Sequence, residues 1–154
     1  MPRLVASQSA AAAPIVAAFE QGLSEVEPVT ARETIAESIQ VGNPASLGWR
    51  ALAALRESGG AAIALSDEEI LEAQHLTGTL AGIFAEPAAA TSVAAARKLR
   101  ERDVIGREEL VVCNLTGHGL KQPEAVRLTD EELRPIHPTL DSLQEKINRA
   151  EGGA

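Results

Sequence analysis

Residues 110–121, LVVCNLTGHGLK, have the types and spacing of a strand that opens into a ligand-binding loop. Thr116 offers a hydroxyl, and the glycines on either side of His118 let the main chain fold tightly around a bound group. The preceding residues 110–115 form an apolar, partly β-branched run, which predicts a buried strand. Because small ligands in open α/β sheets bind just outside such strand ends, this stretch predicts one edge of a binding site.

The other residues capable of nucleophilic, acid–base or metal chemistry give weaker signals. His118 could serve as a general base, but between two glycines we expect it to stabilise its own loop. His75 and His137 are expected at the surface, and three scattered histidines with one cysteine have no metal-ligand spacing. Cys113 is expected to be a small buried apolar residue. A lone cysteine cannot form an internal disulfide, which fits a reducing, cytoplasmic setting.

The composition argues against several classes of partner. The 14 Lys and Arg residues against 22 Asp and Glu give a net charge of −8, with no basic cluster. Nucleic acids and anionic membranes both require a basic face, so we expect neither as a partner. No apolar run approaches the roughly 18 residues of a membrane-spanning helix. The alanine-rich start resembles a signal peptide, but Gln8, Ser9 and Pro14 interrupt the apolar segment that export requires.

Strand and helix patterns alternate along the chain. The predicted strands and helices must position the candidate site residues. Asn43 precedes Pro44 as an N-cap, and Ser66 forms a capping box with Glu69, within an acidic run that we expect to be solvated. The helix after Pro87 is rich in alanine and can approach a sheet closely. Irregular connections are expected at 23–41 and 122–138. The patterns predict strands at 3–8, 61–65 and 110–115, and helices at 11–21, 44–58, 67–80, 88–102 and 139–149.

This order of elements predicts an α/β fold with a parallel sheet. A parallel sheet is normally covered by helices on both faces and contains more than three strands. A three-stranded piece alone would leave sheet edges and apolar faces exposed. We therefore expect a three-layer α/β fold that is incomplete in this chain.

Three motifs resemble those of a known family. They are GNPAS at 42–46, GIFAEPA at 82–88 and LTGHGLK at 115–121, and with weaker matches between them they cover nearly the whole chain in order. The set closely resembles the C-terminal part of threonine synthases, which belong to the tryptophan-synthase-β-like family of pyridoxal-phosphate enzymes. The resemblance implies that residues 1–127 are the C-terminal part of the large cofactor-binding domain. It also implies that residues 128–154 are an extended tail and a C-terminal helix.

The resemblance further implies an activity and a cofactor. Threonine synthases convert O-phospho-L-homoserine and water to L-threonine and phosphate with pyridoxal 5'-phosphate, and homodimers are common among them. Thr116 matches the hydroxyl that hydrogen-bonds the pyridine nitrogen of the cofactor. Gly42 and Asn43 match a segment that lines the cofactor ring, and Glu86 matches a carboxylate at the edge of the active site. Simpler interpretations are a loop hydroxyl for Thr116, a helix cap for Asn43 and a charge that favours a helix start for Glu86.

The departures from the family pattern bear on activity. The lysine that binds the cofactor covalently and the glycine-rich phosphate loop precede this region in the family. Lys98, Lys121 and Lys146 do not stand in the family's lysine motif, and the first and last are expected on exposed helix faces. We therefore assign no catalytic residue and expect the chain to be inactive without a missing N-terminal part as its partner. The alternatives are a piece of a threonine or serine dehydratase of the same family, or a non-catalytic remnant that binds a partner through an exposed sheet edge.

Overall fold

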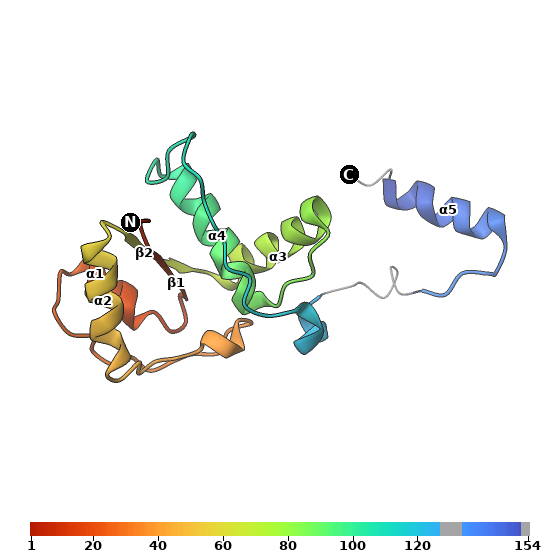
Figure 1. Ribbon diagram of the computed structural model, residues 1–154. Coiled ribbons are helices and arrows are strands. Elements are labelled where there is room, and N and C mark those ends of the chain that lie inside the picture. Colours follow the sequence, from red (N-terminus) through yellow and green to blue (C-terminus); the bar gives the residue numbers. More distant parts are fainter. Residues whose placement is uncertain (127–133, 152–154) are drawn as a thin grey trace.

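The computed structural model describes residues 1–126 and 134–151, and its centre is a two-stranded parallel sheet (Figure 1). β1 (Val5–Ser9) pairs with β2 (Ala61–Leu65) over all five residues of each strand. The predictions of strands near the N-terminus and at 61–65 are confirmed. Both strands point in the same direction, as expected for strands joined through helices.

Helices cover both faces of this sheet, which gives the three layers that were predicted. Successive side chains of β1 reach opposite layers: the Ser7 hydroxyl donates to the Thr91 hydroxyl at 3.2 Å, whereas Gln8 Oε1 accepts from the Ile15 amide at 2.9 Å. In Figure 1 the sheet accordingly lies between one pair of helices and the other. The first pair is α1 (Pro14–Glu20) with α2 (Leu47–Glu57), and the second is α4 (Pro87–Glu101), which packs on the sheet, with α3 (Asp67–Ala81) against α4.

The connection from β2 into α3 forms as its sequence predicts. The Ser66 hydroxyl accepts from the Glu69 amide at 3.3 Å, and the Glu69 carboxylate accepts from the Ser66 amide at 2.8 Å, which completes the capping box. Leu65 and Ile70, on either side of this turn, are fully buried. The alanines of α4 pack on the same core, and their small size allows the helix to approach the sheet closely.

The start of α2 differs from the prediction. The helix begins at Leu47 rather than at Pro44, and Ser46 holds the N-cap position without a side-chain hydrogen bond. Asn43 Oδ1 instead accepts from the Ala45 amide at 2.9 Å. Ala45 has a φ of 46°, outside the helical region, so the chain turns once before the helix can begin. The prediction that Asn43 caps this helix is therefore wrong.

The predicted strand at 110–115 is also wrong. These residues run beside α4 (Figure 1), but no strand forms, and the structure gives their backbone groups no hydrogen bond within the described part of the chain. Leu110 and Val112 are 94% and 85% exposed. Cys113 is half-buried, with Sγ 3.5 Å from the Ser92 carbonyl. A strand requires a neighbouring strand to pair with, and the described residues place none beside this run.

The C-terminal part of the chain contains one further helix. The predicted helix at 139–149 is confirmed as α5 (Leu140–Glu151), which lies apart from the other helices in Figure 1. Short 3-10 helices are present at Glu37–Ile39, Gly119–Lys121 and Pro123–Ala125. The predicted extended tail and the domain boundary at 127–128 fall largely on residues 127–133, outside the described part. None of the described helices is both long and apolar enough to span a membrane.

Candidate functional site

The loop that carries Thr116 is held against the turn that precedes α4. The Glu86 amide donates to the Gly117 carbonyl at 3.0 Å, and the Gly119 amide donates to the Phe84 carbonyl at 2.8 Å. Thus the TGHG and GIFAEPA motifs, about thirty positions apart in the sequence, form one structural unit. The structure brings two of the four predicted site residues, Thr116 and Glu86, into this unit.

Both glycines of the TGHG motif are required by close packing. A Cβ atom added at Gly117 would lie 2.1 Å from the carboxyl carbon of Glu86. At Gly119 an added Cβ would lie 2.4 Å from the ring of Phe84. Neither neighbour is the free end of an exposed flexible chain, so a larger residue at either position must displace the loop.

His118 is exposed, and its contacts lie within and beside its own loop. It pairs with Ala85 in an isolated antiparallel bridge, and its ring meets that of Phe84 edge to face at a centroid distance of 5.7 Å. Its Nδ1 accepts from the Leu120 amide at 3.1 Å. The local role expected for His118 is confirmed, and His75 and His137 are exposed as predicted.

Glu86 is a buried carboxylate with protein partners on both oxygens. Its side chain is 8% exposed, and Oε2 lies 2.7 Å from the Lys121 ammonium. Oε1 accepts from the Ser38 hydroxyl at 3.3 Å. The residue holds the N-cap position of α4, but its side chain forms no capping hydrogen bond. Sequence reasoning identified Glu86 but missed Ser38, which no local pattern marks.

Thr116 differs from its neighbours because its side chain is free to bind a ligand. The residue is exposed, and its hydroxyl forms no hydrogen bond within the residues that the structure describes. A hydroxyl can donate one hydrogen bond and accept others. The rigid turn beneath it therefore presents a polar group with unused hydrogen-bonding capacity.

Gly42 and Asn43 lie in a separate loop. The Gly42 carbonyl accepts from the Val29 amide at 2.9 Å, and an added Cβ at Gly42 would lie 2.2 Å from the Val29 carbonyl oxygen. Asn43 is exposed and bonds only locally, to the Ala45 amide. No hydrogen bond joins either residue to the Thr116 loop in the part of the chain described. Their predicted contact with a cofactor stays a prediction.

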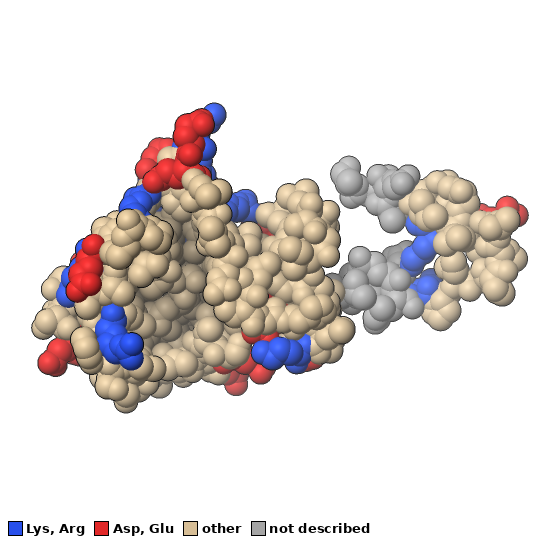
Figure 2. All heavy atoms as spheres, viewed as in Figure 1, with Lys and Arg blue, Asp and Glu red and all other residues tan. Residues whose placement is uncertain are grey.

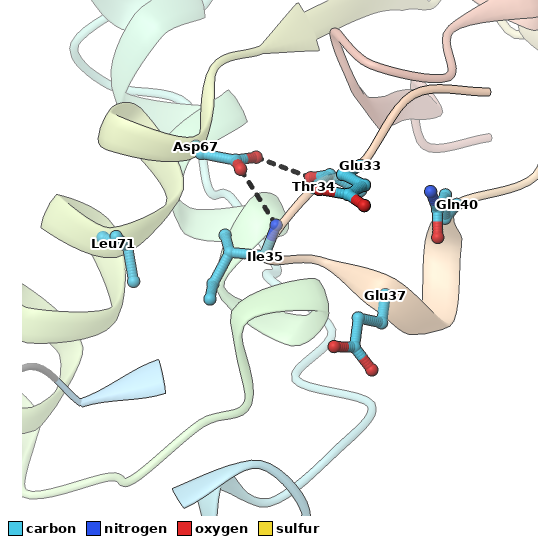
Figure 3. Close-up of a pocket in the computed structure, with 7 residues that line it drawn as sticks. All are labelled: Glu33, Thr34, Ile35, Glu37, Gln40, Asp67 and Leu71. Carbon is cyan, nitrogen blue, oxygen red and sulfur yellow. Dashed lines mark hydrogen bonds between the residues drawn. The ribbon is translucent and has the colours of Figure 1, made fainter. Parts of the chain in front are cut away.

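A cavity of about 510 Å³ opens between the loop that precedes α2 and the first turns of α3 (Figure 3). Asp67 fixes one side of it, because its carboxylate accepts from the Thr34 hydroxyl at 2.5 Å and from the Ile35 amide at 2.9 Å. Asp67 is therefore not the fully solvated residue that the acidic run predicted. The lining includes three carboxylates and no Lys or Arg, which disfavours a phosphate group there. The lining residues are Glu33, Thr34, Ile35, Glu37, Gln40, Asp67 and Leu71.

Lys98 and Lys121 are both held by carboxylates. Lys121 pairs with Glu86, and Lys98 Nζ lies 2.5 Å from Glu69 and donates to the Ala64 carbonyl at 3.3 Å. Lys98 is half-buried, so the prediction that it is exposed is wrong. Burial raises the pKa of Glu69, but hydrogen bonds from Lys98 and the Ser66 amide outweigh this effect and hold that pKa below its ordinary value. Both lysine side chains therefore already have carboxylate partners within this chain.

Cys113 has no features of a reactive thiol. Burial raises the pKa of its Sγ, which disfavours the thiolate that nucleophilic chemistry requires. The described residues contain no group of three or more His, Cys, Asp or Glu side chains placed to hold a metal ion.

Comparisons with known proteins place this arrangement in a family. Residues 1–117 match the family model described as pyridoxal-phosphate dependent enzyme. The threonine synthase of Methanosarcina acetivorans is 44% identical over 147 residues, covering 96% of this chain and 36% of that protein. The threonine synthase of Methanocaldococcus jannaschii is 44% identical over 135 residues, covering 87% and 33%. The chain thus spans about a third of the length of these curated relatives.

Solved structures with the same fold show lower sequence identity. A threonine deaminase from T.th. superposes with a TM-score of 0.53 at 24% identity, covering 64% of this chain and 34% of that one. Serine racemase from Dictyostelium discoideum gives a TM-score of 0.53 at 19% identity, covering 74% and 35%. These likenesses concern the fold alone, and they agree with the helix–sheet–helix layers. Since the family model covers most of the chain, the protein belongs to the family of pyridoxal-phosphate dependent enzymes.

Proposed function

We propose that this chain forms one wall of the active site of a threonine synthase. The observation that carries the proposal is the exposed Thr116 hydroxyl, which is unpartnered among the described residues and presented by a tightly packed Gly-rich turn. The threonine synthases that match nearly the whole chain support the same activity. In the proposal, O-phospho-L-homoserine and water are converted to L-threonine and phosphate.

The residues present fit one edge of the cofactor ring. Thr116 would hold the pyridine nitrogen, Gly42 and Asn43 would line the ring, and Glu86 would lie at the edge of the site. Pyridoxal phosphate supplies an electron sink for the substrate. A hydroxyl is a much weaker acid than a carboxylic acid, so Thr116 would orient the ring without strongly protonating its nitrogen. This restraint limits the side reactions that a stronger electron sink would favour.

The lysine and the phosphate anchor would come from a further polypeptide segment. Lys98 and Lys121 are already engaged by carboxylates. The cavity beside Asp67 is acidic and unsuited to phosphate. We therefore propose that the isolated chain has no turnover and that a segment corresponding to the rest of the relatives' length completes the site.

The sheet offers this segment a place to bind. Residues 110–115 have exposed apolar side chains, and their backbone groups have no hydrogen bond to any described residue. β1 pairs with β2 along one edge. α4 contacts both β1 and residues 110–115, because Thr91 bonds to Ser7 of β1 while the Ser92 carbonyl contacts Cys113. Figure 2 shows a hollow on this face of the molecule, walled mainly by uncharged residues. An apolar strand of the partner would satisfy the backbone groups of 110–115.

The cytoplasmic location and the homodimer of the completed enzyme are parts of the same proposal. A dehydratase activity is the alternative within the family. The threonine deaminase likeness, at 24% identity, concerns the fold and does not favour that reaction. Substrate tests on the completed enzyme distinguish the two activities.

The test uses this chain together with the part of the Methanosarcina acetivorans threonine synthase that does not align with it. We expect the mixture to release phosphate from O-phospho-L-homoserine, and neither part to do so alone. Thr116→Ala should lower turnover about tenfold, since one hydrogen bond to the cofactor is lost, whereas Thr116→Ser should retain most of it. Thr79→Ala, at an exposed threonine of α3, is the matched control. Normal kinetics of Thr116→Ala would remove Thr116 from the site.

A further inference from the structure

We infer that Glu86 is a positioning residue, whose buried carboxylate holds residues 116–119 in the shape that presents the Thr116 hydroxyl. The inference rests on the proposed function, because it assigns a role to Glu86 through Thr116. It differs from a direct role at the cofactor, since the contacts of Glu86 go to its own chain.

The first support is the set of polar contacts that Glu86 makes. Its Oε2 binds Lys121, just after the loop, and its Oε1 binds Ser38, from a distant 3-10 helix. Its own amide donates to the Gly117 carbonyl. The residue thus joins three segments of the chain at one point. Each oxygen thus has a partner from the chain itself, which is what a carboxylate that holds its own loop in place requires.

The second support is steric. The carboxylate of Glu86 occupies the space where a side chain at Gly117 would begin, at 2.1 Å from an added Cβ. The loop therefore rests directly on the carboxylate, one residue after Thr116. A shift of this carboxylate would leave a void beneath Gly117 and allow the loop to move.

The third support is the burial of a charge. The Glu86 side chain is 8% exposed, whereas its partner Lys121 is 61% exposed and lies at the rim. A buried carboxylate is stable only when it is paired and hydrogen-bonded. Lys121 and Ser38 supply these partners, so the position of Glu86 is fixed from both sides of the loop.

The experiment measures amide hydrogen exchange in the full 154-residue chain. Glu86→Gln keeps the size of the side chain but removes its charge. We expect exchange of the amides at 117–122 to rise about tenfold, while the amides of β2 are unchanged. Glu72→Gln, which breaks an exposed ion pair with Arg97, is the matched control and should leave 117–122 unchanged. Unaltered exchange at 117–122 in Glu86→Gln would overturn the inference.

Further variants test the inference if Glu86→Gln does not fold. Lys121→Gln removes the exposed partner and should also raise exchange at 117–122, with β2 unaffected. Gly117→Ala should loosen the loop in the natural background, but less so when combined with Glu86→Ala, because that change removes the clashing carboxylate. Equal effects of Gly117→Ala in both backgrounds would contradict the steric contact on which the inference depends.

The effect of Glu86 on Thr116 is tested by measuring the affinity of the completed enzyme for pyridoxal phosphate. If Glu86 acts through the loop, Glu86→Gln and Thr116→Ala each weaken binding of pyridoxal phosphate, and the double variant is no worse than Thr116→Ala. Fully additive losses would instead indicate a direct contact by Glu86 and overturn the inference. If neither single variant alters the affinity, the proposed role of Thr116 fails, while the exchange result on the loop still stands.

Discussion

β2 and residues 110–115 are both short apolar runs, yet they lie in different environments. β2 pairs with β1 along its whole length, and its Ile63 and Leu65 are almost fully buried. Residues 110–115 lie beside α4 without a backbone hydrogen bond to the described part of the chain, and Val112 is 85% exposed. The local sequence of 110–115, with two valines, is at least as suited to a strand as the alanine-rich sequence of β2. The difference indicates that strand formation depends on a neighbouring strand, and it is the reason for proposing 110–115 as the surface where a partner binds.

The largest expected effect contrasts one side chain from each run. Leu65→Ala should lower the free energy of unfolding by about 2–5 kcal/mol, because it leaves a cavity in the core. Val112→Ala should change it by less than about 0.5 kcal/mol in the isolated chain. Urea denaturation measures both. A comparable loss of unfolding free energy in the two variants would show that residue 112 is already buried. The contrast between β2 and residues 110–115 would then fail.

The next prediction concerns how much the capping box between β2 and α3 contributes to stability. Ser66→Ala should cost about 1 kcal/mol, since it removes the hydroxyl that accepts from the Glu69 amide. Ser46→Ala is the matched control, because Ser46 holds the same position in α2 without a side-chain hydrogen bond. The comparison uses thermal unfolding. Equal shifts of Tm would mean that the capping box contributes nothing.

A smaller effect is expected at a glycine within α3. Gly78 is exposed, and an added Cβ would meet nothing within 4 Å. Gly78→Ala should therefore stabilise the chain by about 0.5–1 kcal/mol. Gly82→Ala should destabilise it, because Gly82 ends the helix at a φ of 66°. Chemical denaturation of the two variants should give shifts of opposite sign, and shifts of the same sign would contradict these backbone assignments.

The smallest effect concerns the link between the start of β1 and the residues that precede 110–115. The Gly106 amide and the Arg3 guanidinium, the latter at 2.6 Å, hold the pKa of Glu109 below its ordinary value. A lowered pKa stabilises the fold above the pKa of the unfolded chain, and this contribution disappears as the pH falls through the folded value. Glu109→Gln should therefore flatten the loss of stability that begins as the pH falls below about 5. The neighbouring Glu108→Gln is the control, and identical profiles for both variants would exclude this link.

Local patterns predicted the parts of the fold that local interactions determine. The Ser66–Glu69 capping box, the start of α4 at Pro87 and the range of β2 all follow from neighbouring residues. Asn43 failed as a helix cap because Ala45 adopts a left-handed conformation, which the sequence pattern does not indicate.

In the candidate site too, local motifs predicted some features, whereas contacts between distant residues could not be predicted. The TGHG motif and Glu86 were found from their motifs, and the structure places them in contact. The Ser38 contact with Glu86 spans 48 positions, and Asp67 reaches Thr34 across 33. Such contacts depend on how the loops fold over the sheet, so residue types and spacing do not reveal them.

The most direct test of the account measures hydrogen exchange at residues 110–115, alone and with the complementary part of the Methanosarcina acetivorans threonine synthase. In the isolated chain we expect these amides to exchange freely while those of β2 are protected. In the mixture, exchange at 110–115 should slow by at least about tenfold, because a partner strand then accepts their hydrogen bonds. Protection of 110–115 in the isolated chain, or free exchange in a mixture that has formed a complex, would contradict the account.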